Sequence, residues 1–139
     1  MAVELQRPGP PGKAPTLQEL FAQGAKLHQQ GKHDEAIALY RRLVVAAPSH
    51  GASWTNLGVL WRIKKKPELA IACHRKAIAL DARQAGAWSN LGNALKDVER
   101  FDEAIDAHRL GVELDNDSAL HWHNYGVTLR EANLTEEAV

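Results

Sequence analysis

The chain has little that would cross-link it, steer it electrostatically or anchor it in a membrane. Its 139 residues include one cysteine, Cys73, which excludes an internal disulfide and is typical of a reducing compartment, so we expect a cytoplasmic protein. Lys plus Arg and Asp plus Glu each number 17, so no net charge attracts nucleic acid or an anionic lipid surface. No apolar run is long enough to span a bilayer, so we expect no membrane partner.

Proline is scarce beyond the start of the chain. Four of the six prolines lie within residues 1–16, where the segment Arg7–Pro15 offers too little apolar surface to offset its ordering entropy. We therefore predict a disordered Pro/Gly-rich lead-in over residues 1–16. The rest, residues 17–139, has the length of one domain.

This domain repeats with a fixed period. Trp54, Trp88 and Trp122 are 34 residues apart, and an asparagine two residues later and a glycine four residues later keep the same spacing. A fixed period indicates one structural unit stacked on copies of itself. Counting from Leu17 as position 1, we predict three complete repeats and a partial fourth: residues 17–50, 51–84, 85–118 and 119–139.

Each repeat carries two apolar stripes separated by a polar break. The first stripe of the first repeat runs from Leu17 to Leu27 at helical intervals. Gly31 follows it, where a left-handed residue suits the end of a helix, and Pro67 lies in a first helical turn, where its missing N–H costs nothing. The sequence therefore predicts an all-α fold of antiparallel helix pairs. The expected helices cover residues 18–30, 34–46, 52–64, 68–80, 86–98, 102–114 and 119–131, followed by a stub from residue 135.

The pattern resembles the tetratricopeptide repeat (TPR) over about residues 17–139. The matching residues are the tryptophans of position 4, Pro48 at position 32, the glycines of position 8 and the alanines of position 20: Gly24, Gly58, Gly92 and Gly126, and Ala36, Ala70, Ala104 and Ala138. Leu20 replaces the first tryptophan, and Ala82 and Asn116 replace the closing proline. The resemblance implies a right-handed superhelical stack of about three and a half repeats, whose first helices line a concave groove. Stacked helical repeats of this kind build interaction surfaces.

The position-8 glycines lie inside helices, where each costs about 1 kcal/mol relative to alanine. We expect the two helices of a repeat to approach closely over this glycine and the alanine of position 20, because closer contact gains dispersion energy. Position 24 is Tyr40, His74 and His108 in the three complete repeats, and we expect these rings to fill the core.

The predicted groove carries a row of carboxamides. Position 6 is asparagine in the second to fourth repeats, Asn56, Asn90 and Asn124, and Asn93 lies at position 9. An asparagine amide offers two donors and an acceptor, which match the polar groups of a peptide backbone. We predict that these asparagines bind an extended peptide together with the position-5 residues Thr55, Ser89 and His123. The alternative is that the asparagines are solvated or bonded to a neighbouring helix.

Basic residues occur only on the flank of this predicted groove. Position 12 contributes Arg62, Lys96 and Arg130, which either steer acidic peptides or form an ordinary charged surface. TPR domains that dock the C-terminal tails of chaperones need Lys or Arg at positions 5 and 9. This chain has none at either position, so we do not expect that activity.

Residues 88–96 (WSNLGNALK) are similar to the repeats that precede the catalytic region of O-linked N-acetylglucosamine transferases and SPINDLY-type proteins. In that family the position-6 asparagines form a ladder that grips substrate peptides; Asn56, Asn90 and Asn124 match it, and Ala22 does not. The resemblance implies that the chain is the substrate-recognition arm of a glycosyltransferase. The competing hypothesis is a stand-alone scaffold that mediates oligomerisation or complex assembly.

The sequence contains no phosphate-binding glycine loop, nucleophile elbow or zinc-ligand spacing. We therefore expect no catalytic residue, no cofactor and no metal in this segment, and a protein or peptide as its partner. The last repeat stops inside its second helix, and a repeat array needs a polar terminal cap. We also expect self-association through this open C-terminal end.

Overall fold

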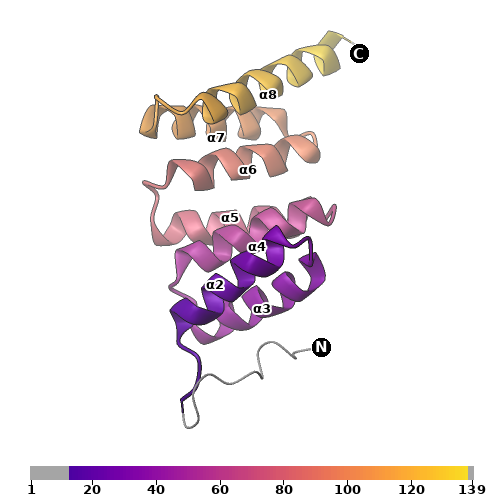
Figure 1. Cartoon of the computed structure of the whole chain (residues 1–139). Coiled ribbons are helices and arrows are strands. Elements are labelled where there is room, and N and C mark those ends of the chain that lie inside the picture. The colour runs from indigo at the N-terminus through magenta and orange to yellow at the C-terminus, as the bar shows by residue number, and fades with distance from the viewer. Residues whose placement is uncertain (1–12, 138–139) are drawn as a thin grey trace.

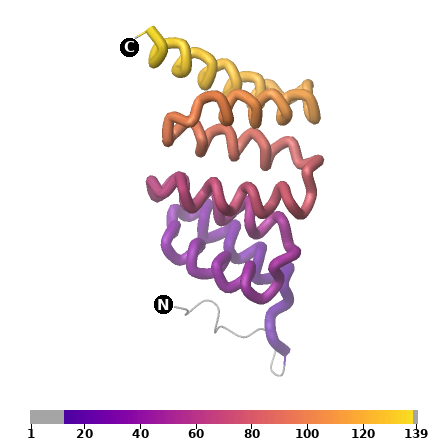
Figure 2. The backbone as a smooth tube through the Cα atoms, turned by 180° about the vertical axis from the view of Figure 1, so that it is seen from behind, coloured from indigo at the N-terminus to yellow at the C-terminus, as the bar shows by residue number. Residues whose placement is uncertain are grey.

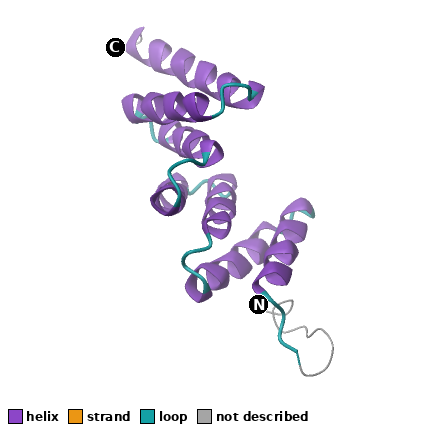
Figure 3. Ribbon diagram, turned by 90° about the vertical axis from the view of Figure 1, so that its left-hand side faces the viewer, coloured by secondary structure: helices purple, strands orange, loops and turns teal. Residues whose placement is uncertain are grey.

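The computed structural model describes residues 13–137, which form seven helices joined by short loops and no strand (Figure 1, Figure 3). The helices are α2 (Leu17–Gln29), α3 (His33–Ala46), α4 (Gly51–Ile63), α5 (Pro67–Leu80), α6 (Ala85–Asp97), α7 (Phe101–Leu114) and α8 (Ala119–Glu137). The predicted all-α fold is therefore confirmed. The first six helices begin and end within about one residue of their expected bounds.

The predicted lead-in over residues 1–16 lies outside the described residues as far as Gly12. Its last residue, Thr16, caps α2: the Thr16 hydroxyl accepts a hydrogen bond from the Glu19 amide (3.1 Å), and the Glu19 carboxylate accepts one from the Thr16 amide (2.8 Å). These hydrogen bonds also lower the pKa of Glu19. This reciprocal pair satisfies two of the otherwise unbonded N–H groups at the start of the helix.

The helices stack in chain order from one end of the molecule to the other (Figure 1, Figure 2). One buried apolar cluster joins α2 to α5 and a second joins α5 to α7, and Trp61 packs against both, so the core is continuous along the stack. Cys73 lies in the first cluster, where burial raises the pKa of its thiol to about 11. It therefore acts as a small apolar side chain.

A ring from the second helix lies directly over the position-8 glycine of the first helix. A Cβ added at Gly24 would be 2.7 Å from the Tyr40 ring, one at Gly58 would be 2.5 Å from His74, and one at Gly92 would be 2.6 Å from His108. We expected a close contact with the position-20 alanine, but the atoms nearest to each of these glycines belong to the ring at position 24. The glycine makes room for the ring at position 24.

Each tryptophan at position 4 fixes the loop that precedes its repeat. The indole Nε1 donates to the carbonyl oxygen six residues earlier, from Trp54 to Pro48, from Trp88 to Ala82 and from Trp122 to Asn116, each at 2.8 Å. The acceptor is always the backbone of position 32. Because only a carbonyl is used, alanine and asparagine replace the expected proline there without loss of this bond.

The turn inside each complete repeat depends on a left-handed residue at position 15. Gly31, Lys65 and Glu99 have φ values of 75°, 64° and 62°. Asn133 occupies the same position in the last repeat, yet α8 continues through it to Glu137, so the expected helix end at residue 131 and new start at 135 were wrong. Among residues 13–137 no helix follows α8 to complete the fourth repeat, and continuing α8 adds one backbone hydrogen bond per residue.

The rings over the glycines predict opposite effects of one substitution at two equivalent positions. Gly92→Ala should lower the free energy of unfolding by about 1–3 kcal/mol, because the new Cβ overpacks against the buried His108 ring. A Cβ added at Gly126 has no atom within 4 Å, so Gly126→Ala should raise the free energy of unfolding by up to about 1 kcal/mol through the higher helix propensity of alanine. Urea unfolding followed by circular dichroism measures both, and equal shifts of the two midpoints would contradict this role of the rings.

Candidate functional site

The position-6 asparagines lie in two kinds of environment: two of them donate to a neighbouring helix and one lines a pocket. The Asn56 amide donates to the Tyr40 hydroxyl at 3.1 Å, and the Asn124 amide donates to the Ser89 hydroxyl at a long 3.5 Å. Both asparagines are half-buried. These two amides are therefore bonded to a neighbouring helix, which was the alternative to peptide binding.

Asn90 and Asn93 instead line a pocket of about 590 Å³ between α4 and α6. Among residues 13–137, neither amide is hydrogen-bonded to another side chain. The pocket is further lined by residues of α4, of the loop after it, of α5 and of α6: Val59, Arg62, Ile63, Lys65, Pro67, His74 and Asp97. Free carboxamides and charged groups therefore share one concave site.

The difference between Asn56 and Asn90 follows from the ring at position 24 of the preceding repeat. For Asn56 that ring is Tyr40, whose hydroxyl accepts the amide. For Asn90 it is His74, which has no phenol oxygen to accept the amide. Asn90 therefore lacks the acceptor that Asn56 has, and the pocket lies beside it.

The electrostatics of the pocket are dominated by Arg62, Lys65 and Asp97. The Arg62 guanidinium donates two hydrogen bonds to the Asp97 carboxylate, at 2.6 and 3.2 Å, and Lys65 carries a further positive charge. Burial, and then the charge of Arg62, lower the pKa of His74 to about 4, so its imidazole is neutral at pH 7. The charged groups of the pocket therefore sum to one positive charge.

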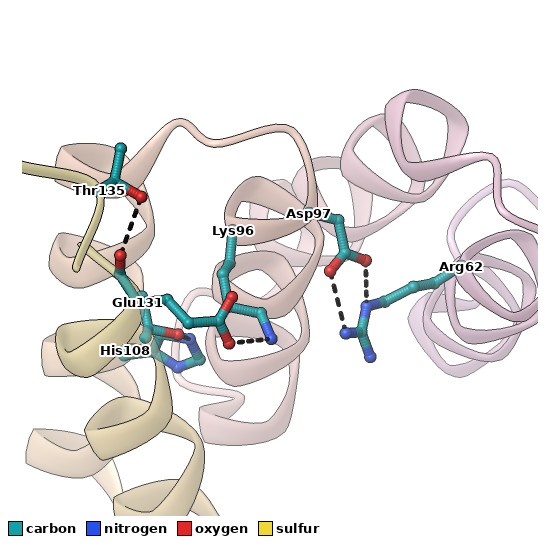
Figure 4. A network of polar contacts seen from close by, with 7 residues as sticks. Arg62, Lys96, Asp97, His108, Glu131 and Thr135 are labelled. Carbon is teal, nitrogen blue, oxygen red and sulfur yellow. Dashed lines mark hydrogen bonds and ion pairs between the residues drawn. The ribbon is translucent and has the colours of Figure 1, made fainter. Parts of the chain in front are cut away.

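Two members of the basic row at position 12 are engaged in ion pairs between repeats (Figure 4). Arg62 bonds Asp97, and Lys96 bonds Glu131 at 3.3 Å; each acid lies 35 residues after its base. These pairs join α4 to α6 and α6 to α8. Arg130 is exposed at the end of the array. Asp97 and Glu131 were missed in the sequence, although an acid one repeat and one residue after each base is the signal that reveals them.

The position-5 residues lie in three different environments. Ser89 is only 2% exposed and accepts the Asn124 amide, so the structure does not place it on the surface. Thr55 is half-buried and His123 is exposed. In the third repeat the side chain one residue before the carboxamide therefore turns toward the neighbouring helix, which periodicity alone did not reveal.

His108 is anchored in the core by the last helix. Its Nε2 atom lies 2.9 Å from the Thr128 hydroxyl, the one buried side chain that α8 contributes among the described residues. Burial, with the nearby charges of Lys96, His121 and Arg62, lowers the pKa of His108 to about 4. The ring therefore stays neutral while it fills the space over Gly92.

Two other kinds of site are absent from residues 13–137. No helix in this part of the chain is both long enough and apolar enough to cross a membrane. No group of three or more His, Cys, Asp or Glu residues there is arranged to hold a metal ion.

Two family models, both described as tetratricopeptide repeat, match the sequence. One covers residues 21–87 and the other covers residues 87–120. Among curated proteins, none matches the chain.

Solved structures of such domains are similar over most of the chain. The first TPR of Spaghetti (RPAP3) bound to the HSP90 peptide SRMEEVD is 25% identical, with a TM-score of 0.79 over 83% of this chain and 91% of that one. The first TPR domain of human RPAP3 is 25% identical, with a TM-score of 0.81 over 88% and 95%. The Sgt2 TPR domain from Aspergillus fumigatus is 24% identical, with a TM-score of 0.82 over 93% and 88%, which supports the fold alone.

The buried imidazoles make stability depend on pH. His74 and His108 take up a proton near pH 4 in the folded chain, but near pH 6.5 once unfolded, so the unfolded state binds more protons between these values. Stability is therefore complete above about pH 6.5 and falls as the pH drops toward 4. We expect each ring to lower the free energy of unfolding by about 1.4 kcal/mol at pH 5.5 relative to pH 7.5.

Urea unfolding at the two pH values measures this loss. His74→Tyr is the matched control, since it places at His74 the ring that already lies over Gly24, and it should remove about half of the loss. An unfolding free energy that is equal at pH 7.5 and 5.5 would contradict the neutral, buried state of the rings.

Proposed function

Because this chain belongs to the tetratricopeptide repeat family, and because a polar pocket opens between its first helices α4 and α6, we propose that it is a protein-interaction module that binds an extended peptide. The peptide lies across the face formed by α2, α4, α6 and α8. The observation that carries this proposal is the pair Asn90 and Asn93, whose amides line the pocket without a side-chain partner in the described part of the chain. Each offers two donors and one acceptor to a peptide backbone.

The charges of the pocket favour an acidic peptide. Arg62 and Lys65 contribute two positive charges against the single carboxylate of Asp97, and His74 is neutral. A Glu or Asp side chain of the peptide can share the Arg62 guanidinium with Asp97 and pair with Lys65. The half-exposed position of the Arg62–Asp97 pair means that exchanging partners costs little.

The comparisons support this class of ligand. The similar first TPR of Spaghetti (RPAP3) is bound to an HSP90 peptide, SRMEEVD, that contains three acidic residues. That peptide belongs to the other protein. It supports the proposal that a domain with this fold binds a peptide with several acidic residues.

Loss of the free carboxamides should weaken binding without unfolding the chain. An N-acetylated, C-amidated library of labelled eight-residue peptides, screened by fluorescence anisotropy, should select sequences rich in Glu and Asp. We expect Asn90→Ala/Asn93→Ala to weaken the best peptide by roughly tenfold or more, since about two hydrogen bonds of about 1 kcal/mol are lost. Asn56→Ala is the control and should change the affinity by less than about twofold, because Tyr40 already holds that amide. Unchanged affinity of the double variant would refute the role of the pocket.

Docking of a chaperone tail by its free carboxylate is not part of the proposal. Position 5 holds Phe21, which packs edge-on against Tyr40 and His50, and the buried Ser89; no Lys or Arg occurs at position 5 or 9. We therefore predict that SRMEEVD with a free C-terminus and its C-amidated form bind this chain with affinities within about twofold of each other, as expected where no cation pairs with the terminal carboxylate. A preference of tenfold or more for the free acid, measured by calorimetry, would reveal a carboxylate-binding site elsewhere.

Two finer hypotheses stay predictions. Membership of a glycosyltransferase arm rests on the phrase at residues 88–96 and on the row of position-6 asparagines, and none of the similar structures named above adds to it. A cytoplasmic location rests on the single cysteine. A glycosyltransferase arm would present peptides that carry serine or threonine acceptors, so enrichment of hydroxyl residues in the selected peptides would support it.

The second candidate function is assembly through the end of the array. Leu120 and Leu134 are exposed on α8 and, with the half-buried Val127, recur every seven residues along one side of that helix. Such a stripe favours contact with another copy or with a complex partner. The Asn90→Ala/Asn93→Ala variant separates the two functions, since assembly through α8 does not use the pocket.

A further inference from the structure

A second pocket lies on the side of α6 that faces away from the peptide pocket. It has a volume of about 290 Å³ and lies between α5, α6 and α7, which follow one another in the stack (Figure 1). From α6 it is lined by Trp88, Leu91 and Leu95. Asn90 and Asn93, which line the peptide pocket, are offset by two residues, or about 160° around the helix. No residue in the described part of the chain lines both pockets.

The preceding repeat has a cation over the equivalent indole. The Lys76 Nζ atom lies 5.9 Å from the centre of the Trp54 ring, where an ammonium is attracted to the electron-rich face. The equivalents of this pair, 34 residues later, are Trp88 and Leu110. Leu110 is 38% exposed and uncharged, and it ends at Cδ, short of the place of a lysine Nζ. Within residues 13–137 no other lysine or arginine lies over an indole in this way, so the Trp88 face has no cation.

The rim of this pocket is more acidic than the equivalent space one repeat earlier. Three replacements account for the difference: Leu69 becomes Glu103, Ala72 becomes Asp106 and Lys76 becomes Leu110. Each replacement makes the lining more negative by one unit charge. The base that remains in the lining, Arg75, has an arginine as its equivalent, Arg41, and leaves the difference unchanged. The third repeat therefore combines an open indole face with an excess of carboxylate.

Both carboxylates of the rim can still meet an incoming cation. Glu103 accepts hydrogen bonds from Arg100 at 2.6 and 2.8 Å and from Arg75 at 3.4 Å, and Asp106 accepts one from Arg109 at 2.8 Å. These side chains are 44–62% exposed. Ion pairs at such exposure are weak, so they exchange partners at little cost.

We propose that this pocket is a docking site for a lysine side chain of a partner protein. The ammonium lies over the Trp88 ring and beside the carboxylates of Glu103 and Asp106, which complement its charge. The methylene stem contacts Ile78 and Leu110, since lysine stems cover apolar surface while the charged end stays in water. The site uses no residue of the peptide pocket, so the proposal does not depend on the proposed function.

The test uses the ¹⁵N-labelled full chain and Nα-acetyl-lysine methylamide as the probe, at constant ionic strength. In ¹H–¹⁵N correlation spectra the Trp88 indole N–H signal should move saturably up to about 50 mM probe, because so few contacts give millimolar affinity at best. The Trp54 signal should stay in place, since Lys76 already lies over that ring. The norleucine and Nε-acetyl-lysine derivatives keep the stem without the charge, and each should bind at least about threefold more weakly.

A variant of α7 supplies the missing cation from the chain itself. Leu110→Lys places an ammonium over Trp88, as Lys76 does over Trp54, and should weaken binding of the probe by at least about fivefold, because a tethered group competes for the same place. Leu114→Lys is the matched control: it adds the same charge at an exposed leucine of α7 outside the lining, and it should bind within about twofold of the parent. Circular dichroism confirms that both variants are folded.

Four outcomes would overturn the proposal. The first is no response of Trp88 up to about 50 mM probe. The second is equal binding of the lysine and norleucine derivatives, and the third is binding by Leu110→Lys that equals the parent. The fourth is a dimer of the parent chain in sedimentation equilibrium that Leu110→Lys dissociates, which would make a lysine of a second copy the occupant.

Discussion

The contact of one ring with one glycine sets the geometry of every complete repeat. Tyr40, His74 and His108 occupy the space that a Cβ would take at the glycine of the facing helix, so the two helices of a pair have one register. The imidazoles do this at the cost of staying uncharged in the core, and burial lowers their pKa values to about 4. The indole bonds of Trp54, Trp88 and Trp122 then fix how each pair follows the previous one.

The same contact decides which part of the inner face is available to a partner. Tyr40 at position 24 accepts the amide of the next asparagine, Asn56, whereas His74 has no hydroxyl and the next asparagine, Asn90, lines the pocket. Asn124 also follows a histidine and bonds Ser89 instead. The polar pocket between α4 and α6 therefore lies beside His74 and not beside Tyr40. The ion pairs Arg62–Asp97 and Lys96–Glu131 hold adjacent first helices together on the same side of the stack.

Periodicity was sufficient to predict the helices but not the fate of individual polar groups. The turns at Lys65 and Glu99 follow from the repeat, although neither residue favours a positive φ, because the packed helix pair requires the turn. Asn133 tolerates that conformation better, yet it is helical, since no helix follows α8 in the described part of the chain. The presence or absence of a following helix thus decided the conformation at position 15, and the local preference of the residue did not.

The sequence by itself determined the all-α repeat, the bounds of six helices and the rings that fill the core, because these depend on spacing along one chain and on the burial of apolar faces. Only the tertiary structure decided that Asn56 is engaged while Asn90 and Asn93 are free, that Ser89 is buried, and that two bases of the flank are paired. These facts depend on which atom of a neighbouring helix lies within about 3 Å of a donor. The period sets the spacing at which candidate partners such as Arg62 and Asp97 recur, whereas packing decides which of them come within bonding distance.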